Sequence, residues 1–197
     1  MKSLSIAFLG PDGSGKSTII DALLESKISF QQKEYFHLKP IPVENSNSKK
    51  VDNPHEKPLY SKIKSYIKLC YFICQYNFGW IKNIHPLKTK SALVIFDRYY
   101  DDILVDYRRY RYGGSQTIAK FVRFFIPKPD LYFILLTEPK IIYERKQEVS
   151  FIELQRQVSE YKTLKDDKRY FIIDVNKTPK EIVKEISFIM KEKMNEK

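Results

Sequence analysis

Residues 10–18 read Gly-Pro-Asp-Gly-Ser-Gly-Lys-Ser-Thr, directly after the apolar run Leu4–Leu9 and directly before a stretch with helical spacing. The stretch matches G-x-x-x-x-G-K-[ST], a loop whose backbone N–H groups surround phosphate oxygens. Its three glycines permit the positive-φ turns that such a loop needs, and the helix that follows favours an anion at its first amides. The stretch therefore predicts a nucleotide-phosphate loop between a strand and a helix.

The side chains of this loop have distinct expected tasks. Lys16 would contact the terminal phosphates as a mobile charge, and the Ser17 hydroxyl would bind Mg²⁺. The residues expected to bind the nucleotide are Gly10, Asp12, Gly13, Ser14, Gly15, Lys16, Ser17 and Thr18. The alternative interpretation is a glycine-rich turn with a purely structural role. The strand that precedes the loop makes this alternative less favoured.

Length and composition bound the rest of the chain. Its 197 residues, 43% of them apolar, suffice for one full core, so a single domain over residues 1–197 is expected. The formal net charge is +11, from 35 basic and 24 acidic residues. This balance suits a polyanionic ligand such as a nucleotide, and it equally permits a nucleic-acid or an anionic membrane surface.

The cysteines, histidines and aromatic runs point to no metal centre and no membrane span. Cys70 and Cys74 lie four residues apart, and the three histidines lack the spacing of a ligand set. The aromatic stretch 66–80 is shorter than the ~20 apolar residues that a transmembrane helix needs. A strand starts close to the first residue and leaves no room for a charged leader, so a cytoplasmic location is expected.

Short apolar runs alternate with helical patterns along the chain, as in βαβ units. This alternation predicts an α/β fold whose parallel sheet is covered by helices on both faces. The candidate strands are Leu4–Leu9, Ser29–Phe36, Ala92–Phe96, Leu131–Leu136 and Tyr170–Asp174.

Helical spacing and capping signals predict the main helices. Apolar residues recur every three or four positions over 59–81, which predicts one long amphipathic helix; they are Leu59, Ile63, Tyr66, Ile67, Cys70, Ile73, Cys74 and Phe78. Capping boxes at Ser150 and Thr178 place helix starts near 151 and 179. Four prolines within 37–58 predict a loop there.

An acid and a base follow the third candidate strand. Asp97 and Arg98 end the run 92–98, and the carboxyl ends of parallel strands line the ligand crevice, so both should face the same cleft as Lys16. Asp97 would hold a water on Mg²⁺, and Arg98 would bind a phosphate through two hydrogen bonds. An ordinary ion pair at a strand end is the alternative.

Together these motifs resemble the thymidylate kinase family of P-loop nucleoside monophosphate kinases. The matching segments are the loop 10–18, Asp-Arg-Tyr-Tyr-Asp at 97–101, Pro-Asp-Leu-Tyr at 129–132 and Arg-Lys at 145–146. The resemblance implies a P-loop NTPase fold with a five-stranded parallel sheet, a short helical lid at about 143–160, and Mg²⁺-dependent transfer of the ATP γ-phosphoryl group to a monophosphate such as dTMP.

The same resemblance implies tasks for individual residues. Asp12 would contact the sugar hydroxyl of the acceptor and Arg98 its phosphate, with Lys16 on the donor. Arg145, Lys146 and Arg156 lie in the lid-like stretch and would clamp the transferring group. Such chemistry depends on positioning and charge neutralisation, so no nucleophilic triad is needed.

Three departures from the family pattern concern the acceptor. A base, Lys39, stands where the family has an acid, and the Ala-Tyr-Gln stretch that would help to read thymine is absent. Residues 107–129 hold six bases and no acid, among them Arg108 and Arg109, so the acceptor side is predicted to include Asp12, Lys39, Arg98, Arg108 and Arg109. The pattern is also similar to thymidylate kinase-like proteins associated with bacterial surface polysaccharide synthesis. A kinase for a sugar or sugar phosphate is therefore an alternative.

Two further classes compete with the kinase. A guanine-reading switch would favour Asn-Lys-x-Asp, but Pro179 stands at the acidic position of 176–179. A nucleic-acid-binding module would use the arginines and aromatic rings of 107–112, without any known fold signature. The expected partners are ATP and a phosphorylated small molecule, with no stable nucleic-acid complex and with a homodimer left open.

Overall fold

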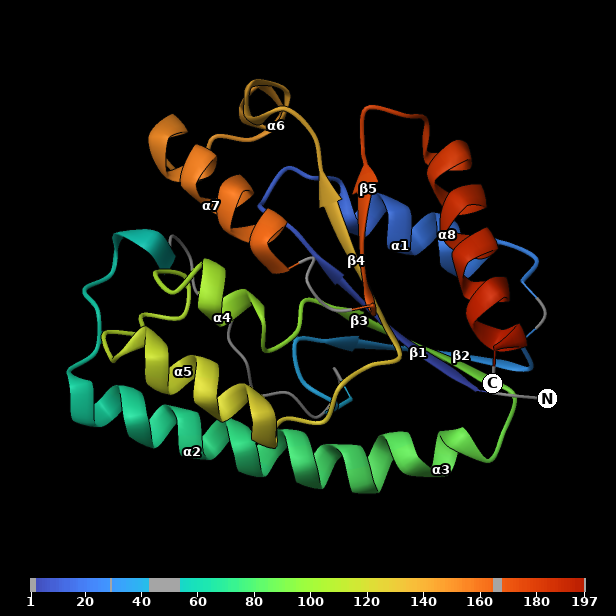
Figure 1. Cartoon of the computed structure of the whole chain (residues 1–197), viewed down its shortest axis with the longest axis horizontal. Coiled ribbons are helices and arrows are strands. Elements are labelled where there is room, and N and C mark those ends of the chain that lie inside the picture. The colour runs from blue at the N-terminus through green and yellow to red at the C-terminus, as the bar shows by residue number, and fades with distance from the viewer. Residues whose placement is uncertain (1–2, 29, 43–53, 165–167, 197) are drawn as a thin grey trace.

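The computed structural model of the chain describes residues 3–28, 30–42, 54–164 and 168–196. Five strands form one parallel sheet in the order β2-β3-β1-β4-β5 (Figure 1). The strands are β1 Leu4–Leu9, β2 Gln32–His37, β3 Ala92–Asp97, β4 Leu131–Leu136 and β5 Tyr170–Asp174. The predicted α/β fold is confirmed. The second strand begins later than predicted, and residue 29 lies outside the described residues.

Helices cover both faces of the sheet, as Figure 1 shows. On one face, α1 Lys16–Glu25 and α8 Pro179–Asn195 pack on side chains such as Ile6, Phe8 and Ile95. On the other face, helices from the middle of the chain pack on Leu9 and Phe96. The central strands are buried on both sides, which explains why they are continuous apolar runs rather than alternating ones.

The predicted long helix exists, but it buries the face opposite to the predicted stripe. It consists of α2 Lys62–Gly79, a π-helical turn η3 Trp80–Ile84 and α3 His85–Lys88, and it runs along one edge of the molecule (Figure 1). Its buried residues are Ser65, Leu69, Phe72, Tyr76 and Gly79. Ile63 and Phe78, from the predicted stripe, are 74% and 72% exposed. Both faces of α2 carry apolar residues, so periodicity alone selected the wrong one.

Shorter helices complete the layers around the sheet. They are η2 Pro54–Glu56, α4 Asp102–Val105, α5 Gln116–Val122, η4 Arg123–Phe125, α6 Pro139–Arg145 and α7 Phe151–Thr163. The segment 143–160 predicted as a lid thus contains the end of α6 and most of α7. Of the loop predicted over 37–58, residue 37 ends β2, 54–56 form a helical turn, and 43–53 lie outside the described residues.

The helix starts near 151 and 179 are confirmed. Thr178 and Glu181 form a complete capping box, whereas at Ser150 only the bond from the Glu153 amide to the hydroxyl forms. The Glu153 carboxylate instead accepts hydrogen bonds from Arg156. Among the described residues, no helix combines the length and the apolar content that crossing a bilayer requires.

Candidate active site

The loop between β1 and α1 has the backbone of a phosphate cradle. Gly10, Gly13 and Gly15 have φ values of 139°, 84° and 82°, all in the region that favours glycine. A Cβ on Gly10 would lie 2.6 Å from the Leu135 carbonyl oxygen, and one on Gly13 would lie 3.0 Å from the Lys146 Cβ. Both glycines are therefore required by conformation and by space.

Lys16 is buried at the start of α1 and folds back over the loop. Its Nζ donates to the carbonyl oxygens of Gly10 and Pro11 at 2.7 and 2.9 Å and lies 3.4 Å from the Ser14 Oγ. Burial, followed by the charge of Arg98, lowers the pKa of Lys16 to about 7. Within the described residues this ammonium contacts two carbonyl oxygens and a hydroxyl, all of them uncharged, so a phosphate would be a better partner.

Asp97 ends β3 beside the phosphate loop and offers a free carboxylate oxygen. Its Oδ2 accepts a hydrogen bond from the Tyr35 hydroxyl at 3.3 Å, while its buried Oδ1 has no hydrogen-bond partner within the described ranges. Burial alone would raise the pKa of Asp97, but the hydrogen bond from His37 and the charges of Lys16 and Arg98 hold it below its ordinary value. An ionised oxygen with a free lone pair, together with the exposed Ser17 in the first turn of α1, fits a Mg²⁺ site.

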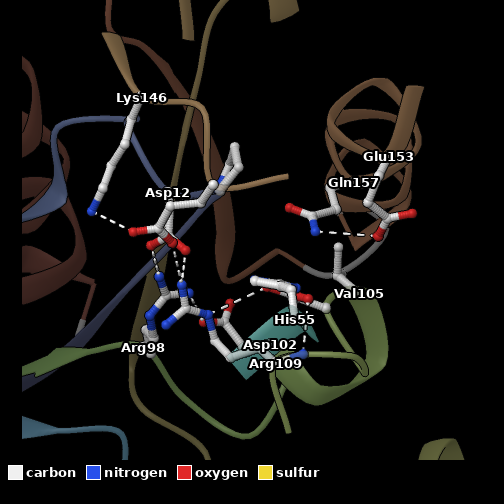
Figure 2. Close-up of polar contacts among 12 residues, drawn as sticks. Asp12, His55, Arg98, Asp102, Val105, Arg109, Lys146, Glu153 and Gln157 are labelled. Atoms are coloured by element: carbon white, nitrogen blue, oxygen red, sulfur yellow. Dashed lines mark hydrogen bonds and ion pairs between the residues drawn. The ribbon is translucent and has the colours of Figure 1, made fainter. Parts of the chain in front are cut away.

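Arg98 and Arg109 converge on Asp12 of the phosphate loop, as Figure 2 shows. The positive φ of Arg98, 71°, turns the chain sharply after β3, and its guanidinium is almost fully buried. Its Nη1 donates to the Asp102 Oδ2 at 2.8 Å, and Tyr161 donates to the other oxygen of that carboxylate at 2.8 Å. The structure thus brings together the sequence-predicted residues Asp12, Arg98 and Arg109.

Asp102 and Tyr161 were not predicted as site residues, and neither were three further neighbours of this centre: Asp106, His55 and Glu148. The His55 Nε2 lies 3.5 Å from the Asp106 Oδ2, and Arg109 reaches Asp106 at 3.3 Å and Glu148 at 3.0 Å. Burial raises the pKa of Asp106 to about 7 and lowers the pKa of His55. Asp106 and Glu148 stand near recognised motifs, at 97–101 and 145–146, whereas His55 lies in a predicted loop.

The ligand atoms of Asp12, His55 and Glu148 lie within 4.8 Å of one another, which is close enough for a metal ion. Asp12 is however already paired with two arginines, and Glu148 with Arg109 and, at 2.5 Å, with Lys146. These cations neutralise both carboxylates, so this part of the site suits an anion better than a cation.

The remaining predicted residues do not join the Asp12 centre. Arg145 donates to the Val175 carbonyl at 3.3 Å, and Arg156 binds Glu153 and the Val105 carbonyl. Arg108 is exposed over the Tyr107 ring, and the Lys39 Nζ donates to the Gln75 side chain at 2.8 Å. Among these residues only Lys146 reaches toward the centre, through Glu148.

A glycine cradle after the first strand of a parallel α/β sheet, with an acid at the end of the adjacent strand, defines a P-loop NTPase fold. The family model "Thymidylate kinase" matches residues 8–186, and the chain therefore belongs to the thymidylate kinase family. It is a kinase, an enzyme that transfers phosphoryl groups.

Similar proteins carry the same name. The chain is 25% identical to a probable thymidylate kinase of Methanosarcina barkeri and 24% identical to one of Pyrobaculum aerophilum; each match covers 94% of this chain and 95% of the relative. Among solved structures, thymidylate kinase of Ehrlichia chaffeensis superposes with a TM-score of 0.64 at 19% identity, covering 96% of this chain and 100% of that one. Thymidylate kinase of Candida albicans gives 0.68 at 20% identity, covering 100% and 94%.

Proposed function

We propose that this kinase moves the γ-phosphoryl group of ATP to the phosphate of a nucleoside monophosphate such as dTMP. The observation that carries the proposal is the convergence of Arg98 and Arg109 on Asp12, within the phosphate loop itself. Two guanidinium groups beside a triphosphate cradle are suited to hold a second phosphate next to the first. Such a reaction implies a cytosolic location, where ATP is supplied.

On the donor side, Lys16 would leave the carbonyls of Gly10 and Pro11 and contact the terminal phosphates. Ser17 and Asp97 would hold Mg²⁺, which when bound neutralises charge on the phosphate oxygens. Gly13, Ser14, Gly15 and Thr18 would direct backbone amides and a hydroxyl at the same phosphates. Burial of Lys16 keeps water away from this contact and strengthens it.

On the acceptor side, the guanidiniums of Arg98 and Arg109 would exchange part of their pairing with Asp12 for the acceptor phosphate. Asp12 would then accept a hydrogen bond from a sugar hydroxyl. An acceptor phosphate oxygen forms the new bond to the γ-phosphorus, the bond from that phosphorus to the β–γ bridging oxygen breaks, and ADP leaves with the electron pair. The acceptor oxygen is already anionic, so the residues position it and need not deprotonate it.

The lid would supply further positive charge. Arg145, Lys146 and Arg156 flank the junction of α6 and α7, and closure of this segment would bring guanidinium groups to the transferring phosphoryl. Arg156 would have to release Glu153, to which it donates at 2.6 and 2.9 Å. Lys146 needs the smallest movement, since its Cβ already lies beside Gly13.

Release of ADP from Mg²⁺-ATP tests the proposed function, with nucleoside monophosphates and sugar phosphates as acceptors. We expect Arg109→Gln to raise the KM for the acceptor about tenfold or more, because a charge-assisted contact is lost, and to leave the KM for ATP unchanged. Lys184→Gln, an exposed change on α8, is the matched control. ADP release that no acceptor increases would refute the proposal.

We also propose that a second copy of the chain covers the exposed face of α2 and α5. Apolar side chains at least two-fifths exposed gather there: Leu59, Ile63, Ile67, Tyr71, Phe78, Ile81, Ile118, Phe121, Phe124 and Phe125. At roughly 100 Å² each, they would bury about the area per partner of a standard stable interface. Asn77 of α2 donates to the Phe125 carbonyl at 2.9 Å and so joins α2 to η4, which directly follows α5.

A further inference from the structure

Three cations gather around two aromatic rings outside the Asp12 centre. The Lys39 and Lys68 Nζ atoms lie 5.7 and 5.6 Å from the centroid of the Phe72 ring. Lys68 also lies 5.4 Å from the Tyr60 ring, and the Arg111 Cζ lies 4.3 Å from that same ring. Lys39, Lys68 and Arg111, which we call the cationic cluster, are all partly buried.

Within the described part of the chain, the hydrogen bonds of this cluster go to neutral oxygens. Lys68 donates to the Tyr110 carbonyl at 2.6 Å, Lys39 to the Gln75 side chain at 2.8 Å, and Arg111 to the Pro58 carbonyl at 2.9 Å. The sequence segments 57–96 and 107–129, which supply Lys68, Arg111 and both rings, contain no Asp or Glu. The segments that supply Lys68, Arg111 and both rings thus offer no carboxylate to the cluster.

Among the residues that the structure describes, no salt bridge joins this cluster to a carboxylate, and partly buried like charges without a counter-ion destabilise one another. Burial, followed by the charges of Lys39 and Arg111, lowers the pKa of Lys68 to about 8, and burial lowers the pKa of Lys39. The fold nonetheless holds these side chains in place: Tyr76 donates to the Leu38 carbonyl at 2.6 Å and fixes the loop that carries Lys39. An anion among the three would remove the repulsion.

Tyr110 connects the cationic cluster to the Asp12 centre. Its carbonyl accepts the bond from Lys68, and the residue before it, Arg109, pairs with Asp12. The Tyr110 hydroxyl is buried without a hydrogen-bond partner in the described part of the chain, and burial and the charge of Asp102 raise its pKa. Tyr110 therefore adjoins the cluster through its carbonyl and the Asp12 centre through its chain neighbour Arg109.

We propose that the cationic cluster binds a second anionic group of the acceptor. The acceptor would then be a phosphomonoester whose far end carries a carboxylate or another phosphate. The proposal rests on the proposed function, because that function makes the Asp12 centre the site of the acceptor phosphate. A neutral base or sugar would leave the three charges of the cluster uncompensated.

Matched acceptors that differ by one anionic group test this proposal. UMP is compared with orotidine monophosphate, and galactose 1-phosphate with galacturonic acid 1-phosphate; both pairs differ by a carboxylate. Glucose 1-phosphate is compared with glucose 1,6-bisphosphate to separate phosphate from carboxylate recognition. We expect kcat/KM for ADP release to be at least about tenfold higher for the more anionic member of at least one pair, because charge-assisted contacts form.

Variants assign this preference to the cluster. Lys68→Gln and Lys39→Gln should each reduce it about tenfold, Lys68→Arg should retain most of it, and Lys184→Gln should leave it unchanged. Equal kcat/KM within every pair for the wild type, or an unaltered preference in both glutamine variants, would overturn the proposal while the kinase function stands. Melting curves of the variants verify that they fold.

Binding without turnover separates the two proposals. If no acceptor increases ADP release, the proposed function fails. Calorimetry with galacturonic acid 1-phosphate, orotidine monophosphate and glucose 1,6-bisphosphate then tests anion binding by the cluster independently of turnover. Affinity about tenfold lower in Lys68→Gln, with the Lys184→Gln control unchanged, supports an anion site. Equal affinity in the wild type and Lys68→Gln for all three contradicts it.

Discussion

Asp12 forms ion pairs with two arginines, and the proposed reaction requires the same arginines to bind the acceptor phosphate. In the free protein the carboxylate compensates the charges of Arg98, which is buried, and Arg109, which is partly buried. Removing one partner of a buried pair leaves an uncompensated charge, at a free-energy cost of about 3–5 kcal/mol. An acceptor phosphate can enter this centre only by replacing part of an existing pairing, so Asp12 stabilises the site when the acceptor is absent.

Protonation of Lys16 gives a direct test of the donor site. Its pKa of about 7 makes the side chain mostly neutral at pH 8, and phosphates beside it would return the pKa toward 10.5. Binding of Mg²⁺-ATP at pH 8 should therefore take up nearly one proton, measured by calorimetry in buffers of different ionisation enthalpy. Lys16→Met should abolish the uptake and lower turnover by about 10²-fold or more. Uptake that persists in Lys16→Met would exclude this residue as its source.

Asp106 makes stability depend on pH in a predictable direction. Its folded pKa of about 7 exceeds the unfolded value of about 3.9, so the folded state binds the proton more tightly. Stability should then fall as pH rises from about 4 to about 7 and stay low above that range. Asp106→Asn cannot ionise, so thermal unfolding should show it more stable than the wild type at pH 8, by about 1–4 kcal/mol, and about equal at pH 4. Parallel curves for the two proteins would contradict this assignment.

The candidate site could be predicted from sequence only where its residues sit in short motifs. Asp12 lies inside the glycine loop and Arg98 follows a buried strand, so both could be placed at the carboxyl edge of a parallel sheet. His55 meets Asp106 across about fifty residues, and it comes from a proline-rich segment that predicts only a loop. Such a contact depends on the chain bringing η2 beside the residue that caps α4, which local patterns do not encode.

At the scale of elements, strands were easier to predict than the orientation of helices. Central parallel strands are buried on both faces, so each is a mainly apolar run with clear ends, in which Ser5 of β1 is an exception. Helix α2 carries apolar residues around most of its circumference, with Leu69 and Phe72 on one side and Ile67 and Phe78 on the other. Periodicity then indicates a helix but cannot tell the core from an exposed apolar face.

The contact between α2 and the loop after β2 depends on the absence of a side chain at Gly79. A Cβ there would lie 2.5 Å from the Pro40 carbonyl oxygen, so the loop would have to move. Gly79→Ala should destabilise the protein by about 1–3 kcal/mol in urea unfolding, although alanine favours a helix by about 1 kcal/mol. Lys82→Ala, at an exposed position in η3, should change stability by less than about 0.5 kcal/mol. If the Gly79→Ala protein is as stable as the Lys82→Ala protein, the loop moves at little cost in free energy and the prediction is wrong.

Across the whole molecule, the excess positive charge is concentrated in two segments of the middle of the chain. Segments 57–96 and 107–129, which contain α2, α3 and α5, hold seven and six basic residues and no acidic residue, while the rest of the chain is close to neutral. The phosphate loop and α1 come from the other part of the chain. The charge that distinguishes this protein thus lies on the acceptor side and on the exposed apolar face, rather than at the donor site.

This distribution gives the proposed dimer a distinctive salt dependence. If a second copy covers α2 and α5, apolar side chains such as Ile67 and Phe78 meet in the centre, and lysines such as Lys64 and Lys82 surround them without any carboxylate from these segments. Salt screens this like-charge repulsion and leaves the apolar contact, so association should tighten as salt rises from about 0.05 to about 0.5 M.

Sedimentation of the wild type at the two salt concentrations measures the effect. Ile67→Asp and Phe78→Asp should each give a monomer at both concentrations, because they place a charge in an apolar interface, whereas Lys184→Gln on α8 should associate like the wild type. A wild-type monomer at every concentration, or a dimer that survives both aspartates, would mean that this face does not bind a second copy.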